Sequence, residues 1–198
     1  YYPGARNMTL KVTYERDTGR ILGAQGVGFG GVDKRTDVLA AAVRAKMTDA
    51  DLAGLDLCYA PPYSSAKDPV NMAGYVIGNV RSGIVKQHEW KDVEAISADG
   101  NALLLDVQTA GEFAEAHLKG AVNIPVDELR SRMGELDKTK KIYVNCYSGL
   151  RSYIACRMLS AEGFDCSNLS GGIRFYKVVA EGGSYDSVSR HLCGMKGE

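Results

Sequence analysis

The sequence has no excess of charge of either sign and no long apolar run. Lysine and arginine together number 24, as do aspartate and glutamate, so the formal net charge is zero. Proteins that bind nucleic acid or anionic membranes through charge usually carry a basic excess. No segment approaches the roughly 18 apolar residues of a membrane span, and no secretory signal pattern is visible at the N-terminus. We therefore expect neither a nucleic-acid partner nor a membrane partner.

Cysteines are few, and their spacing is not that of a metal site. The five cysteines are Cys58, Cys146, Cys156, Cys166 and Cys193. Their number is odd and no two form a Cys-x-x-Cys pair, which argues against a disulfide scaffold and a closed zinc site. We expect no bound metal. We also expect the thiols to be reduced, as in a cytoplasmic protein. Neither Cys156 nor Cys166 has the spacing of a redox pair with Cys146, and Cys193 is a weak candidate for a resolving thiol.

The pattern of apolar residues divides the chain into two blocks. In the first block we expect strands at 8–14 and 20–27 and helices at 38–47, from 48 and at 71–80. The chain opens at Tyr1 without methionine, beside a strand-like segment, so we expect it to be part of a longer protein. The predicted domains are 1–80 and 85–188, joined by a linker at 81–84 and followed by a tail at 189–198.

The second block alternates strand and helix. The expected strands are 103–107, 121–124, 141–145 and 166–169, and the expected helices are 109–116, 126–133, after 151 and from about 173. This alternation predicts an α/β fold, a parallel sheet flanked by helices. The first block, with its hairpin and helices, predicts an α+β domain. Ligands of parallel sheets lie at the carboxyl ends of the strands, and Cys146 follows one such end.

The stretch 146–152 joins this apolar strand to a helical pattern. Its residues are Cys146, Tyr147, Ser148, Gly149, Leu150, Arg151 and Ser152. A loop in this place gathers its N–H groups around the sulfur at a helix N-terminus, where anions are favoured. That setting favours the thiolate, which is the reactive form of cysteine. We therefore take Cys146 as the candidate nucleophile and the six residues after it as its candidate substrate-binding loop.

Two chemistries and one structural alternative are open for this loop. Only four residues lie between Cys146 and Arg151, fewer than in phosphotyrosine-type phosphatases, and the smaller loop suits a sulfur atom better than a phosphate. Gly149 allows a tight turn, and Arg151 either supports the loop or faces an anionic donor. The alternative is that Cys146 is a buried strand-end cysteine without a reaction, since buried cysteines are common.

The second block resembles the rhodanese domain over nearly its whole length. The shared motifs are Leu105-Asp106-Val107, Gly111-Glu112-Phe113, the run 117–125, the loop 146–152 and Leu169-Ser170-Gly171-Gly172. The resemblance implies that Cys146 carries sulfur as a persulfide. The usual Asp-Val-Arg of the family reads Asp106-Val107-Gln108 here, which changes an ion pair near the site. We expect Asp106 to hydrogen-bond the loop backbone or Arg151, and Glu112 and His117 to be structural.

The first block resembles the C-terminal dimerisation domain of flavin-dependent pyridine-nucleotide disulfide reductases, within the coenzyme A-disulfide reductase and NADH-dependent persulfide reductase group. The resemblance rests on the motifs at 18–25 and 59–71. It implies a homodimer in which the second motif reaches the flavin and thiol site of the partner subunit. Tyr63, Lys67 and Tyr2 are then candidate cofactor-binding residues, and Lys67 is expected to meet a coenzyme A phosphate.

Together the two resemblances predict the C-terminal part of a coenzyme A-disulfide or persulfide reductase. The intact enzyme would use FAD, NAD(P)H and coenzyme A, and its flavin and nicotinamide domains would lie outside this chain. The implied donor of sulfur to Cys146 is a polysulfide, a persulfide or thiosulfate. The rival hypothesis is a rhodanese-like sulfide-binding or regulatory docking module without turnover of its own.

Overall fold

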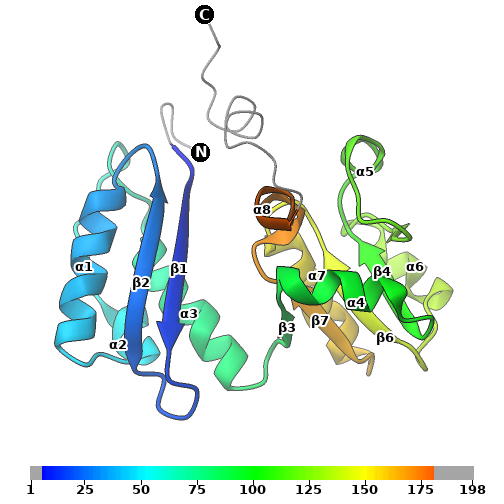
Figure 1. Cartoon of the computed structure of the whole chain (residues 1–198), viewed down its shortest axis with the longest axis horizontal. Coiled ribbons are helices and arrows are strands. Elements are labelled where there is room, and N and C mark those ends of the chain that lie inside the picture. The colour runs from blue at the N-terminus through cyan, green and yellow to red at the C-terminus, as the bar shows by residue number, and fades with distance from the viewer. Residues whose placement is uncertain (1–5, 181–198) are drawn as a thin grey trace, which may run out of the picture. The chain divides into compact units, whose positions relative to one another are not determined.

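The computed structural model describes residues 6–180 of the 198-residue chain (Figure 1). The described residues form two compact units, and the chain passes from the first to the second between Gly83 and Ile84. No helix within this part of the chain is long and apolar enough to cross a membrane. Tyr2 and Cys193, two of the predicted functional residues, lie outside the described residues.

The first unit is an antiparallel hairpin with three helices, as the α+β prediction requires. Its elements are β1 (Met8–Tyr14), β2 (Ile21–Gly28), α1 (Val32–Arg44), α2 (Asp49–Gly54) and α3 (Pro69–Arg81). α1 begins six residues before the predicted start at 38, because Gly31 turns the chain into the helix with a φ of 67°. Thr48 and Asp68 open α2 and α3 with capping boxes, and α3 extends to Arg81, the first residue of the predicted linker.

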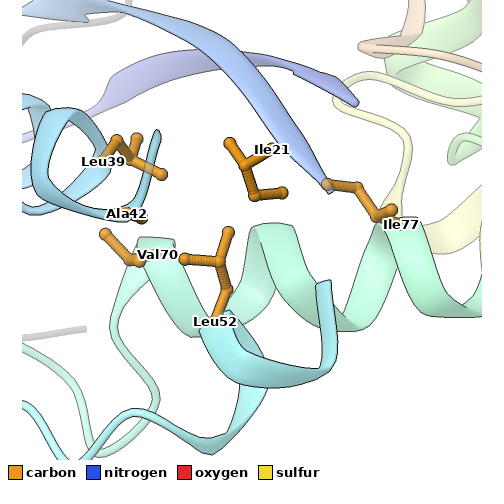
Figure 2. Packing of buried hydrophobic residues seen from close by; sticks show 6 residues of the cluster. All are labelled: Ile21, Leu39, Ala42, Leu52, Val70 and Ile77. Carbon is orange, nitrogen blue, oxygen red and sulfur yellow. The ribbon is translucent and has the colours of Figure 1, made fainter. Parts of the chain in front are cut away.

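The core of this unit is an apolar cluster to which every helix contributes. Its buried members are Ile21 from β2, Leu39 and Ala42 from α1, Leu52 from α2, and Val70 and Ile77 from α3. Figure 2 shows these side chains converging between the strand and the helices. Burial of such side chains contributes about 1.5 to 3 kcal/mol each and provides the main stabilisation of a small unit.

The second unit is a five-stranded parallel sheet with the strand order β3-β7-β6-β4-β5. The strands are β3 (Gln87–His88), β4 (Ala102–Asp106), β5 (Val122–Asn123), β6 (Lys141–Asn145) and β7 (Cys166–Leu169). The helices are α4 (Val93–Ala98), α5 (Ala110–Glu115), α6 (Leu129–Arg132), α7 (Leu150–Ala161) and α8 (Gly172–Ala180), with 3₁₀ turns at Trp90–Asp92 and Met133–Glu135. The α/β prediction is confirmed, but β3 and α4 were not predicted.

Helices cover both faces of this sheet (Figure 1). On one face, Leu104 and Leu169 pack with residues of α4 and with Ile173 of α8. On the other face, the Cys166 thiol contacts the backbone of α7, and the Asn168 amide donates to the carbonyl of Gly149, the residue that precedes α7. The sheet therefore fixes both the loop that follows β6 and the helix that the loop enters.

Candidate active site

Cys146 stands at the carboxyl end of the central strand β6, where the sequence predicted it. Its Sγ accepts a hydrogen bond from the backbone N–H of Gly149 at 3.2 Å and one from the hydroxyl of Ser152 at 3.3 Å. Gly149 has a φ of 102°, a left-handed conformation that suits glycine and turns the chain into α7. Both donors point at one sulfur atom and would stabilise negative charge there.

The side chain of Cys146 is buried, with an exposed fraction of 0%. The sequence hypothesis required a sulfur that a donor can reach, and in this respect the structure differs from it. A reaction at Cys146 therefore requires this side chain to become accessible to the donor. Leu150 and Ser148, in contrast, are exposed at the surface of the loop.

The N-terminus of α8 holds the outer side of this loop. The backbone N–H groups of Ile173 and Arg174 donate to the carbonyls of Cys146 and Tyr147, at 2.9 and 3.0 Å. A Cβ placed on Gly172, which has a φ of 66°, would lie 2.6 Å from each of these carbonyl oxygens. The motif Gly171-Gly172 is therefore needed where the loop and α8 approach each other most closely. Sequence analysis identified this motif only by resemblance, without a role.

Arg151, in the first turn of α7, forms a bidentate ion pair with Glu112 of α5. The two N···O distances are 2.7 and 2.8 Å. The Arg151 guanidinium lowers the pKa of Glu112 to about 2, with further help from Thr109, so Glu112 is ionised at neutral pH. Glu112 is also the third helical residue of a capping box with Thr109, which confirms its expected structural role. Its second role, as the partner of Arg151, was not predicted.

Asp106, at the end of β4, has other partners than the expected ones. Its buried carboxylate accepts hydrogen bonds from the backbone and side chain of Gln108, at 2.9 and 3.1 Å, and from Asn145 at 2.8 Å. Burial raises the pKa of Asp106 in spite of these bonds. The amide of Gln108 thus stands where the family's usual arginine would supply a cation. Asp106 therefore holds the side chain of Asn145, the residue before Cys146, while Arg151 pairs with Glu112.

Tyr147 follows Cys146 in the loop, and two further cysteines lie in α7 and β7. Burial raises the pKa of the Tyr147 phenol, and the charge of Arg174 acts in the opposite direction. Cys156 and Cys166 are both buried free thiols, and the Cys166 Sγ lies 3.5 Å from the carbonyl oxygen of Cys156. Their proximity was not visible from sequence spacing, because it arises from packing between α7 and β7.

Tyr63 and Lys67 belong to the first unit, in the segment between α2 and α3. Tyr63 is 78% exposed, and the Lys67 ammonium lies over the ring of Tyr75, 5.4 Å from its centre. Arg35 of α1, which sequence analysis missed, holds this segment: its guanidinium donates to the Tyr63 carbonyl, to the Ser64 hydroxyl and to the carboxylate of Asp68. Arg35 precedes the helical pattern predicted from residue 38, and its position in the sequence gave no signal of this contact.

These features define a chain of two known domain types. Residues 89–177 match the rhodanese-like domain family, and residues 1–69 match the pyridine nucleotide-disulphide oxidoreductase dimerisation domain. The two matches agree with the two resemblances seen in the sequence, a reductase dimerisation domain followed by a rhodanese-like domain.

Among its relatives, the chain is 47% identical over 75 residues to coenzyme A disulfide reductase of Staphylococcus haemolyticus, a match that covers 38% of this chain and 17% of that protein. The structure of reduced Bacillus anthracis CoADR-RHD matches with 42% identity and a TM-score of 0.87, over 98% of this chain and 33% of that one. A NAD-dependent persulfide reductase from A. fulgidus matches with 41% identity and a TM-score of 0.78, over 88% and 31%. The chain thus spans about one third of the length of these two solved proteins.

Proposed function

We propose that this chain is the sulfur-carrying part of a coenzyme A-disulfide or persulfide reductase, and that Cys146 takes up sulfane sulfur as a persulfide. The observation that carries the proposal is the position of the Cys146 sulfur, which the Gly149 N–H and the Ser152 hydroxyl both reach at the N-terminus of α7. Negative charge that develops on sulfur in this loop meets donors that are already oriented.

In the proposed reaction, the Cys146 thiolate attacks the outer sulfur of the donor once its side chain is accessible. A new S–S bond forms to Cys146, the S–S bond of the donor breaks, and its remaining part leaves with the electron pair. From thiosulfate the persulfide forms already ionised, and from a hydropersulfide it forms protonated and then loses its proton to solvent. The ionised persulfide carries its negative charge on the terminal sulfur. Arg174 and Ile173 hold the loop carbonyls outward through their N–H groups, which keeps the loop N–H groups directed inward.

In the longer protein, we propose that the first unit forms a homodimer and contributes Tyr63 and Lys67 to a cofactor site. A phenol hydroxyl and an ammonium group on an exposed segment fit the phosphate groups of coenzyme A or FAD. When bound, FAD and NAD(P)H would supply the electron pair for the reduction of a disulfide or persulfide. The names of the relatives support this part of the proposal. We place the protein in the cytoplasm, where thiols such as Cys146 stay reduced.

The test of the sulfur-transfer step is a thiosulfate:cyanide sulfurtransferase assay on the chain. Cys146→Ser should lower thiocyanate formation to the uncatalysed background, because the sulfur acceptor is gone. Cys58→Ser, at an exposed cysteine of the first unit, is the matched control and should keep the wild-type rate. If the folded wild-type chain shows no transfer from thiosulfate, persulfide or polysulfide, the enzymatic proposal is wrong and the docking-module hypothesis takes its place.

A further inference from the structure

The charge of Arg151, the cation in the first turn after the cysteine loop, is matched by Glu112. Both terminal nitrogens of Arg151 donate to the two oxygens of the carboxylate. Glu112 is in turn held by Thr109, whose backbone N–H and hydroxyl donate to it at 2.9 and 2.8 Å. The carboxylate is therefore fixed from two sides. The Arg151 guanidinium directs its paired donors at this carboxylate and also interacts with the Cys146 sulfur.

This pairing matters for the charge of the donor that Cys146 can use. An arginine with a free pair of donors binds a sulfonate or phosphate group in a bidentate manner. Thiosulfate presents such a dianionic group, whereas the hydropersulfide of an uncharged thiol is neutral or carries a single charge. With Glu112 in place, the pair has no net charge. Arg174 is a further cation near the loop, since its charge acts on Tyr147.

We propose that Glu112 is a positioning residue that sets the donor specificity of Cys146: by holding Arg151, it favours hydropersulfides of low charge over dianionic thiosulfate. This inference rests on the proposed sulfur transfer at Cys146. Both uptake reactions balance. The thiolate and R–S–SH give the Cys146 persulfide and R–S⁻, and the thiolate and S–SO₃²⁻ give the ionised Cys146 persulfide and SO₃²⁻.

The test compares uptake from two donors, thiosulfate and the hydropersulfide of 2-mercaptoethanol. Uptake adds one sulfur atom, about 32 Da, to Cys146. The rate at which this adduct forms is measured by quenching the reaction at set times and weighing the protein by mass spectrometry, and it gives a second-order rate constant for each donor. Glu112→Gln removes the charge but keeps a residue that completes a capping box. Glu115→Gln removes one charge from the exposed side of the same helix and is the matched control.

Glu112→Gln should raise the ratio of the thiosulfate to the hydropersulfide rate constant by roughly fivefold or more, the effect of one unit charge a few ångström away in water. High salt should reduce this gain, and Glu115→Gln should leave the ratio unchanged. Glu112→Ala, a second variant for the case that Glu112→Gln does not fold, should also raise the ratio.

Three outcomes would contradict the role of Glu112 or the sulfur transfer on which it rests. Cys146-dependent uptake with the same donor ratio in the wild type, Glu112→Gln and Glu112→Ala would overturn the specificity role and leave the proposed function standing. Uptake that Cys146→Ser does not abolish would overturn the proposed function itself. A donor ratio that rises equally in Glu115→Gln would show a general effect of net charge and would also overturn the role of Glu112.

Discussion

Each unit of the chain holds a candidate functional segment with an arginine–carboxylate pair, but the two pairs differ in burial. In the Arg35–Asp68 pair, the side chains are 6% and 3% exposed. In the Arg151–Glu112 pair, they are 30% and 39% exposed. The same kind of ion pair thus occurs in two environments. One is buried and holds Tyr63 and Ser64 in the first unit, and the other is half-exposed beside the Cys146 loop in the second.

The buried pair is stable because every strong donor of Arg35 has an acceptor. Its guanidinium donates to Gly31, Tyr63, Ser64 and Asp68. Burial alone would raise the pKa of Asp68, but hydrogen bonds from Arg35, Val70 and Ser64 lower it. Such a pair fixes a segment rigidly and leaves no charge for a ligand. The exposed pair contributes less to stability, and solvent or a charged donor can compete for it.

The largest expected effect comes from breaking the buried pair. Arg35→Met leaves the Asp68 carboxylate buried without its partner, which should cost about 3 to 5 kcal/mol. Hydrogen exchange of the α3 amides reports the opening free energy of the first unit alone. In the double variant Arg35→Met/Asp68→Asn the buried charge is gone and an N-cap residue remains, so much of the loss should be recovered. Equal losses in the single and double variants would contradict this account.

A second prediction concerns Gly172, which lies against the carbonyls of Cys146 and Tyr147 in the loop beside the exposed pair. Gly172→Ala places a Cβ 2.6 Å from two loop carbonyls, so it should cost about 1 to 3 kcal/mol more than conformational strain alone and slow sulfur uptake at Cys146 by about tenfold. Gly163→Ala is the control: Gly163 has a φ of 84° with open space around its missing Cβ. It should cost about 1 kcal/mol. Urea unfolding followed by the fluorescence of Trp90, the single tryptophan of the chain, measures both variants.

If Gly163→Ala and Gly172→Ala behaved alike, the contact between α8 and the loop would not be what requires glycine. A loss of uptake in Gly172→Ala with unchanged stability would instead show that α8 positions the loop without this contact being needed for folding.

The sequence predicted those parts of the site that are local in the chain. A continuous apolar strand, a glycine and a helical pattern are neighbours around Cys146, so periodicity and turn chemistry were enough to place the sulfur at the end of β6. The two ion pairs join residues 39 and 33 positions apart. No local pattern determines which arginine meets which carboxylate. Sequence analysis accordingly gave Arg151 only as one of two possible partners of Asp106 and did not pair it with Glu112.

Two elements, β3 and α4, were not predicted because they are too short to show a pattern in the sequence. β3 has two residues, too few to show an alternation, and α4 has six, less than two turns of apolar periodicity. Both become regular only because they pack against β7 and β4. The burial of Cys146 likewise depends on how the loop closes, which the residue types alone do not fix.

The smallest expected effect separates the specificity role of Glu112 from its contribution to folding. Because the pair with Arg151 is partly exposed, Glu112→Gln should lower the free energy of unfolding by no more than about 1 kcal/mol at neutral pH.

The pKa of Glu112 is about 2 in the folded protein, below its ordinary value of 4.5, so the unfolded chain binds the proton first as the pH falls. The stabilisation is therefore present above pH 4.5 and is lost towards pH 2, and the wild-type and Glu112→Gln curves should converge there, while Glu115→Gln should follow the wild type throughout. A loss well above 2 kcal/mol at neutral pH would mean that this pair resembles the buried one, and a changed donor preference would then have to be attributed to a disturbed loop. A small loss together with a changed donor ratio would show that Glu112 selects the donor by neutralising Arg151, and not through its contribution to folding.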